Sequence, residues 1–163
     1  MTAHDLQEIF DEINELKFKK ILGVELPKIE IVISTKMIRT YGRFFWNNKM
    51  KTTKIKISQK HIDVHELDEV KETLLHEMVH FYEWTVHKTT SHGYFFMKTI
   101  KQLGGHPDRF SPVKMSPDEY PVVYKCTHCG KKYGFGKTLK NRRSCSVCCP
   151  NKYNPEYILK KVK

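Results

Sequence analysis

The sequence has no long hydrophobic run. None of its apolar stretches approaches the roughly 18 consecutive apolar residues that a membrane-spanning helix needs. The first five residues, Met1 to Asp5, also lack the basic start and the apolar core of a secretion signal. We therefore expect a cytoplasmic protein in a reducing compartment, without a membrane partner.

Cysteine is absent from the first 125 residues, and all five cysteines lie between Cys126 and Cys149. Because disulfides are rare in reducing compartments, this clustering indicates metal binding. Acidic residues are also scarce there: residues 1–120 carry 18 basic and 17 acidic residues, whereas residues 121–163 carry 11 basic residues and one acidic residue. This shift predicts a domain at 1–120 with a core of ordinary size, and a small basic domain at 121–163.

The first part contains two histidines that are one helical turn apart. The segment 74–81 reads LLHEMVHF, and periodic apolar residues predict a helix from about Glu66 to His87. On such a helix His76 and His80 can point at one zinc ion. Glu77 is poorly directed for ligation but is placed to accept a proton from a zinc-bound water, as in zinc peptidases. The pattern predicts a catalytic zinc site; the alternative is a core helix with incidental histidines.

A catalytic zinc ion needs a third protein ligand and an open fourth position. His87 lies seven residues, about 10 Å, beyond His80, whereas zinc–nitrogen bonds are about 2 Å long, so a straight helix excludes it. His92 is the better candidate, because it follows a polar break and opens a second apolar segment that can fold back. Two other zinc-peptidase patterns do not fit. Glu83 stands where the metzincin pattern needs glycine, and no glutamate between residues 83 and 119 could serve as a downstream carboxylate ligand.

The segments before this helix predict a small sheet. An amphipathic helix ends near Gly23, and its apolar face carries Leu6, Ile9, Phe10, Ile13 and Leu16. Three strand-like runs follow: 28–34 and 52–58 alternate apolar and polar residues, and 41–46 is rich in aromatic residues. Each strand has one apolar face to bury, so we expect an antiparallel meander packed on the metal helix, in an α+β fold. Asn47 and Asn48 form a plausible hairpin turn. Residues 36–60 contain eight basic and no acidic residues, typical of a solvated strand face or of a rim that contacts an anionic polymer.

The second part contains two CxxC pairs. Cys126 with Cys129, and Cys145 with Cys148, have the spacing of a four-cysteine zinc ribbon, after a connector marked by Pro107, Pro112, Pro117 and Pro121. Four thiolates close the coordination shell, so this zinc ion is predicted to be structural and part of the folding free energy. Cys148 is preferred over Cys149 because it completes the CxxC pair.

Basic and aromatic residues occupy the segment between the cysteine pairs. Cations that pair with phosphates, beside aromatic rings that stack on unpaired bases, are typical of a surface for single-stranded nucleic acid. The alternative is that the two aromatic residues form the core of the ribbon and the cations keep it soluble. The candidate nucleic-acid-binding residues are Lys131, Lys132, Tyr133, Phe135, Lys137, Lys140, Arg142 and Arg143.

These motifs together resemble the SprT family, which includes the Spartan DNA-dependent proteases. The resemblance rests on the histidine motif at 74–80, on His92-Gly93 followed by Phe96, and on Tyr124-Lys125-Cys126 opening a CxxC pair; Gly42 and the strand at 55–58 also fit. It implies a zincin-like catalytic domain with His76, His80 and His92 on zinc and with Glu77 as the general base. It also implies a ribbon that binds DNA, and cleavage of proteins attached to DNA.

The sequence therefore predicts a zinc metalloprotease with one catalytic and one structural zinc ion, acting on protein substrates and bound to or activated by DNA. One alternative is a nucleic-acid-binding regulatory protein on a non-catalytic zincin scaffold. Another is a peptidase that processes one partner and uses its basic tail to dock on an acidic protein. The intact Glu77 weighs against the scaffold hypothesis, because a scaffold needs the histidines more than the base.

Overall fold

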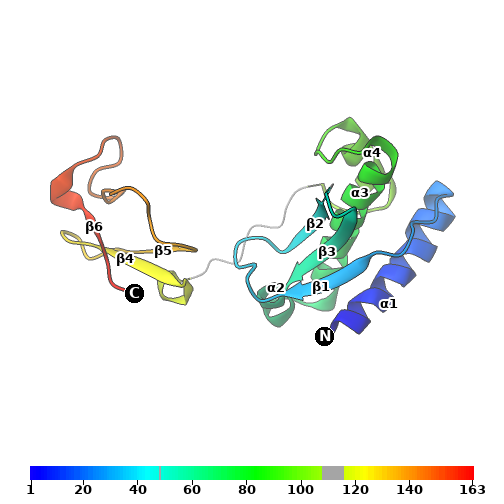
Figure 1. The fold of residues 1–163 in the computed structure, drawn as a ribbon, viewed down its shortest axis with the longest axis horizontal. Helices are drawn as coiled ribbons and strands as arrows, with labels where there is room; N and C mark the ends of the chain where they lie inside the picture. Colours follow the sequence, from blue (N-terminus) through cyan, green and yellow to red (C-terminus); the bar gives the residue numbers. More distant parts are fainter. Residues whose placement is uncertain (48, 108–115) are drawn as a thin grey trace. The chain divides into compact units, whose positions relative to one another are not determined.

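The computed structural model describes residues 1–47, 49–107 and 116–163 (Figure 1). The chain forms two compact units, Met1–Pro112 and Val113–Lys163. The predicted domain boundary between 120 and 121 stays a prediction. Asn48 of the predicted turn and Pro112 of the predicted connector lie outside the described residues. Within the described ranges, no helix is long and apolar enough to cross a membrane.

The first unit combines helices with a three-stranded sheet, which confirms the predicted α+β class (Figure 1). Its elements are α1 (Ala3–Ile13), the π-helix η1 (Asn14–Leu22), β1 (Glu30–Ser34), β2 (Gly42–Asn47), β3 (Thr52–Ser58), α2 (Gln59–Val64), α3 (Leu67–His87) and α4 (Tyr94–Gln102). The helix predicted from about Glu66 to His87 is confirmed as α3, which Glu66 caps and which ends at Lys88 in a left-handed conformation.

The sheet differs from the predicted antiparallel meander. Its order is β1-β3-β2, and β1 pairs with β3 in parallel, so only β2 and β3 form an antiparallel pair. The central place suits β3 because Ile55 and Ile57 are fully buried. Alternation of apolar and polar residues predicts which face of a strand is buried, but it does not predict which strands are neighbours. The prediction of an antiparallel sheet was therefore wrong.

The core of the first unit lies between the sheet and α3. Ile55 and Phe44 from the sheet belong to one buried cluster with Leu74 and Met78 of α3. The predicted apolar stripe of α3 is buried except at its first residue, Leu67, which is 47% exposed. Burial of this stripe fixes the rotation of α3 about its axis, and so decides which residues of the helix face away from the core.

The amino-terminal helix changes its geometry halfway. Thr2 caps α1 through a reciprocal pair of hydrogen bonds with Asp5. After Ile13 the chain continues as the π-helix η1, whose hydrogen bonds join residues five apart. Phe18, five residues after Ile13, is therefore fully buried, whereas Leu16 is 47% exposed. The prediction that Leu16 lies on the buried face was wrong because it assumed α-helical spacing.

The second unit is a small antiparallel sheet with little apolar core. Its elements are the 3-10 helix η2 (Pro117–Glu119), β4 (Val122–Cys126), β5 (Lys132–Phe135), the 3-10 helix η3 (Pro155–Tyr157) and β6 (Leu159–Lys161), and the sheet order is β5-β4-β6. Among its described residues, the buried hydrophobic ones are Val123, Tyr124, Cys126, Cys145 and Leu159. So small a core is little apolar surface for a fold to bury.

Candidate metal centre and its cleft

Three histidines converge beside α3. His76 and His80 lie one turn apart on the helix, and His92 lies in the turn that leads into α4. The Nε2 atom of His92 is 3.1 Å from that of His76 and 3.2 Å from that of His80. Ligands at about 2.0–2.1 Å from a tetrahedral zinc ion are about 3.3 Å apart. The spacing and the donor type therefore fit one zinc ion, and the structure brings together the three predicted ligands. His87 is exposed and packs against Phe95 instead.

Phe96 contacts all three imidazoles. This side chain of α4 is fully buried, and its ring centroid lies 4.8 Å from that of His76, 4.5 Å from that of His80 and 4.7 Å from that of His92. One aromatic ring thus contacts ligands that are 16 residues apart in the chain. Because rings in van der Waals contact cannot rotate freely, Phe96 restricts the orientations of the three Nε2 atoms.

The side chain of Glu77 extends from α3 toward the edge strand β2. Its side chain is 7% exposed, and its Oε2 atom accepts a hydrogen bond of 2.6 Å from the backbone N–H of Phe44. Gly42 makes this approach possible, because a Cβ atom at that position would lie 2.8 Å from Cγ of Glu77 and 2.8 Å from Cγ2 of Thr73. The carboxylate therefore occupies space that any other residue at position 42 would fill.

A cleft of about 580 Å³ opens in front of these residues. His76, His80, His92 and Glu77 line it, together with residues of the segment 39–46, which includes most of β2. Of the residues that could stabilise a developing oxyanion, Tyr41 and Arg43 also line the cleft. Tyr94 is 83% exposed and is not among the lining residues. The cleft is large enough for a short extended peptide beside the three imidazoles.

A second pair of histidines supports one wall of the cleft. The ring of His61 stacks on Tyr41 at 4.2 Å, and its Nε2 atom is 2.9 Å from the hydroxyl of Thr73 on α3. Burial lowers the pKa of His61 to about 4, and repulsion from the neighbouring His65 contributes to this shift. His61 is therefore neutral at physiological pH and acts as a packing residue between α2, α3 and the cleft.

Sequence reasoning missed the role of Glu83. This glutamate lies one turn beyond His80 on α3 and is 3% exposed. Its carboxylate binds Ser91, the residue directly before His92. The signal in the sequence was an acidic residue three positions after His80, on a helix whose neighbouring positions are apolar. The metzincin pattern requires glycine at position 83, so comparison with that pattern does not predict that Glu83 binds the loop before His92.

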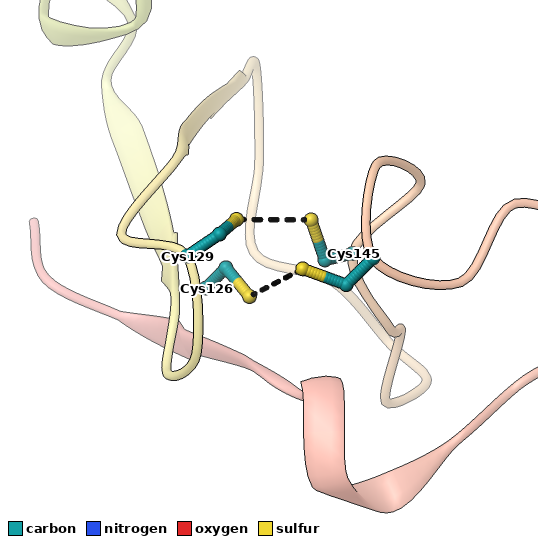
Figure 2. A group of neighbouring side chains, drawn as sticks. Cys126, Cys129 and Cys145 are labelled. Carbon is teal, nitrogen blue, oxygen red and sulfur yellow. Dashed lines mark hydrogen bonds between the residues drawn. The ribbon is translucent and has the colours of Figure 1, made fainter.

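The four predicted cysteines also converge. The Sγ atoms of Cys126 and Cys148 are 4.0 Å apart, and those of Cys129 and Cys145 are 3.6 Å apart; Figure 2 shows the labelled cysteines facing one another. Sulfur atoms at about 2.3 Å from a tetrahedral zinc ion are about 3.8 Å apart, so this set fits a closed zinc site. Cys149 is not part of this group, and its thiol bonds to the carbonyl of Lys152.

Hydrogen bonds favour a thiolate at Cys145. Burial alone would raise the pKa of this thiol, but the Tyr133 hydroxyl and the backbone N–H groups of Cys148 and Val147 lower it to about 6. A thiol that ionises near neutral pH is a ready metal ligand, because zinc binds the thiolate.

The candidate nucleic-acid residues divide into two groups. Tyr133 and Phe135 pack against the core of the second unit, and Phe135 meets Tyr124 edge to face at 5.5 Å. The basic residues are all exposed: Lys131, Lys132, Lys137, Lys140, Arg142 and Arg143. Lys132 pairs with Asp118 at 2.8 Å. Tyr153, which the sequence pattern did not single out, is 53% exposed. Nucleic-acid binding by the eight candidate residues stays a prediction.

The chain is similar to proteins of one family. A model of the SprT-like family matches residues 6–116, a range that holds the three histidines and Glu77 and stops before the cysteines. The human germ cell nuclear acidic protein is 30% identical over 156 residues, which cover 86% of this chain and 22% of that protein. The "Protein SprT-like" of Oceanobacillus iheyensis is 23% identical over 142 residues, which cover 86% of this chain and 91% of that protein.

Proposed function

This chain belongs to the SprT-like family, and from that premise we propose that it is a zinc-dependent peptidase of the SprT type with a zincin-like first unit. The observation that carries the proposal is the convergence of three histidine Nε2 atoms beside a buried glutamate in one open cleft. Three imidazoles leave one position of a tetrahedral zinc ion free, as in catalytic sites. The four-cysteine group instead suits a second, structural zinc ion.

The residues of the cleft have distinct roles in peptide hydrolysis. His76, His80 and His92 would hold the zinc ion, which would lower the pKa of a bound water to about 7 and polarise the peptide carbonyl. Glu77 accepts the proton of the attacking water and returns it to the leaving amine. The N–H of Phe44 orients the Glu77 carboxylate through the bond of 2.6 Å. The backbone of β2 therefore sets the direction in which the base points.

The test of this role is Glu77→Gln. The amide keeps the size of the side chain but cannot accept the proton, so casein cleavage should fall at least about 100-fold. Zinc content should stay at two ions per chain. Glu8→Gln, on the exposed face of α1, is the matched control and should cleave like the wild type. A Glu77→Gln variant that cleaves at the wild-type rate would remove Glu77 from the mechanism.

We propose that the second unit binds single-stranded DNA through its exposed cations. Residues 121–163 carry 11 basic residues and one acidic residue, more charge than solubility requires. Reversing Lys140, Arg142 and Arg143 to glutamate should weaken binding of a labelled oligonucleotide and reduce its salt dependence, measured by fluorescence anisotropy. The same reversal at the exposed Lys20, Lys28 and Lys98 of the first unit is the control. Equal loss in both triple variants would contradict a binding surface in the second unit.

The proposed partner also supplies regulation. An intracellular peptidase needs a signal that restricts it to its substrates, and nucleic acid bound to the basic unit can provide one. We expect cleavage of protein substrates, and above all of proteins attached to DNA, to rise when single-stranded DNA is added. An unchanged rate at low salt, where binding is tightest, would count against activation.

The second candidate function is a nucleic-acid-binding regulatory protein on a non-catalytic scaffold. The cleft disfavours it, because Gly42 and the N–H of Phe44 accommodate a glutamate that a scaffold does not need. The two functions differ in one assay: digestion of casein in the presence of DNA, blocked by a zinc chelator. Binding of DNA without any chelator-sensitive cleavage would favour the scaffold.

A further inference from the structure

Glu83 is a buried carboxylate that the proposed mechanism leaves without a role. Its Oε2 atom accepts a hydrogen bond of 2.7 Å from the backbone N–H of Ser91, and its Oε1 atom accepts one of 2.9 Å from the Ser91 hydroxyl. The hydroxyl oxygen in turn accepts the N–H of Gly93 at 3.1 Å. These bonds enclose His92 on both sides. The carboxylate thus holds the backbone on either side of the third histidine.

The same carboxylate faces the second histidine. Its Oε2 atom is 3.9 Å from Nδ1 of His80, too long for a hydrogen bond but close for two groups that are 3% and 12% exposed. A negative charge at this place favours the tautomer of His80 that carries its proton on Nδ1. That tautomer presents the lone pair of Nε2, the atom that lies 3.2 Å from Nε2 of His92.

We propose that Glu83 is a positioning residue of the metal centre, which clamps the His92 loop to α3 and orients His80 for metal binding. The inference rests on the proposed zinc site and extends it to the next turn of the same helix. The alternative is a purely structural role, in which Glu83 joins the end of α3 to the following loop and leaves metal affinity unchanged. The two roles differ in whether the histidine site or the whole unit is weakened.

The first measurement is zinc release in the full chain. Glu83→Gln keeps the size of the side chain but removes its charge and one acceptor oxygen, so a colorimetric chelator should extract the histidine-bound zinc at least about tenfold more readily. The cysteine-bound zinc is an internal reference, because its ligands lie in the other unit and its release should not change. His76→Ala, with only that reference zinc, gives the baseline.

Two further variants separate positioning from stability. Ser91→Ala removes one of the two bonds to Glu83 and should give a smaller effect in the same direction, and the two substitutions should be non-additive because they break one contact. Glu69→Gln is the matched control: this glutamate of α3 also accepts a backbone N–H, that of Glu66 at 2.8 Å, and it does not line the cleft. It should release zinc like the wild type.

The outcomes are distinguishable. Faster release from the histidine site in Glu83→Gln, with a thermal midpoint of the metal-free protein near that of Glu69→Gln, supports positioning. Wild-type release with a lowered midpoint would overturn it in favour of the structural role. If Glu83→Gln does not fold, wild-type release in Ser91→Ala overturns the clamp. If the wild-type chain holds a single zinc ion that His76→Ala retains, the proposed function itself fails.

Discussion

Replacing Gly42 by alanine tests the geometry of the base without removing it. A Cβ atom at this position would lie 2.8 Å from Cγ of Glu77, 2.8 Å from Cγ2 of Thr73 and 3.0 Å from Oε1 of Glu77. Carbon atoms in contact prefer about 3.5–4.0 Å, so both side chains must move. Overpacking of this kind costs about 1–3 kcal/mol of unfolding free energy. For a unit of this size the thermal midpoint should fall by about 4–12 °C.

The effect on catalysis should be larger than the effect on stability. Displacing Glu77 breaks its bond with the N–H of Phe44, and a misplacement of about 1 Å can cost about 100-fold in rate. We expect Gly42→Ala to lower kcat/KM for casein by about that factor while both zinc ions stay bound. Tryptophan fluorescence follows unfolding of the first unit specifically, because Trp46 and Trp84 both lie in it.

Gly23→Ala is the control for general destabilisation. Gly23 has a φ of 68°, and a Cβ atom there would meet no other atom within 4 Å, so alanine adds backbone strain of about 1 kcal/mol without touching the cleft. It should lower the thermal midpoint and leave kcat/KM unchanged. In a Glu77→Ala background, Gly42→Ala should cost less free energy than in the wild type, because two of its three contacts are gone. Wild-type activity in Gly42→Ala would refute the argument.

Three further predictions concern pH, metal and packing. In the folded protein the pKa of His61 is lowered from 6.5 to about 4, so protonation of His61 favours the unfolded chain. The contribution of neutral His61 to the free energy of unfolding is therefore complete above pH 6.5. It is lost as the pH falls toward 4, by up to about 3 kcal/mol. Urea unfolding of the metal-free protein at pH 7 and 4.5 should show this loss, and His61→Phe should flatten it. Cys126→Ser should lower the zinc content from two ions to one ion per chain and unfold the second unit while the first unit stays folded. Circular dichroism would detect this partial unfolding. Phe96→Ala should cost about 3–5 kcal/mol and weaken zinc binding at the histidines, whereas Phe96→Leu should retain more of both.

The parts of the fold that sequence could predict are those set by local spacing. The period of α3 from Val70 to Phe81 predicted the helix, its buried stripe and the position of His76 and His80 beside that stripe. The distance along a straight helix excluded His87 as a ligand beside His80 and left His92 as the candidate. In the structure, His92 lies next to His76 and His80. The cysteine spacing likewise predicted which thiols converge. Each of these inferences needed only distances along one short segment.

The parts that failed depend on contacts between distant segments. Strand alternation placed Ile55 and Ile57 on the buried face but could not show that β3 lies between β1 and β2, because pairing is decided by the whole sheet. The α-helical spacing of three or four residues also placed Leu16 on the apolar face of the first helix. No local sequence signal predicted the π-helix, whose wider turns bury Phe18 instead. The aromatic residues of the second unit were ambiguous for the same reason: their type fits both stacking and packing.

The centre of the cleft combines both kinds of information. The rise of about 1.5 Å per residue that places His87 about 10 Å beyond His80 places Glu83 only about 4.5 Å beyond it. His76, His80 and Glu83 of α3 therefore occupy successive turns along one edge of the helix, and Glu77 lies beside His76. Each has a partner from a different segment: β2 binds Glu77, the loop before α4 binds Glu83, and Phe96 of α4 contacts the imidazoles. A rigid helix sets the spacing of these groups, and non-local contacts set their orientation, so substitutions in the partners should alter metal binding and rate more than they alter the helix.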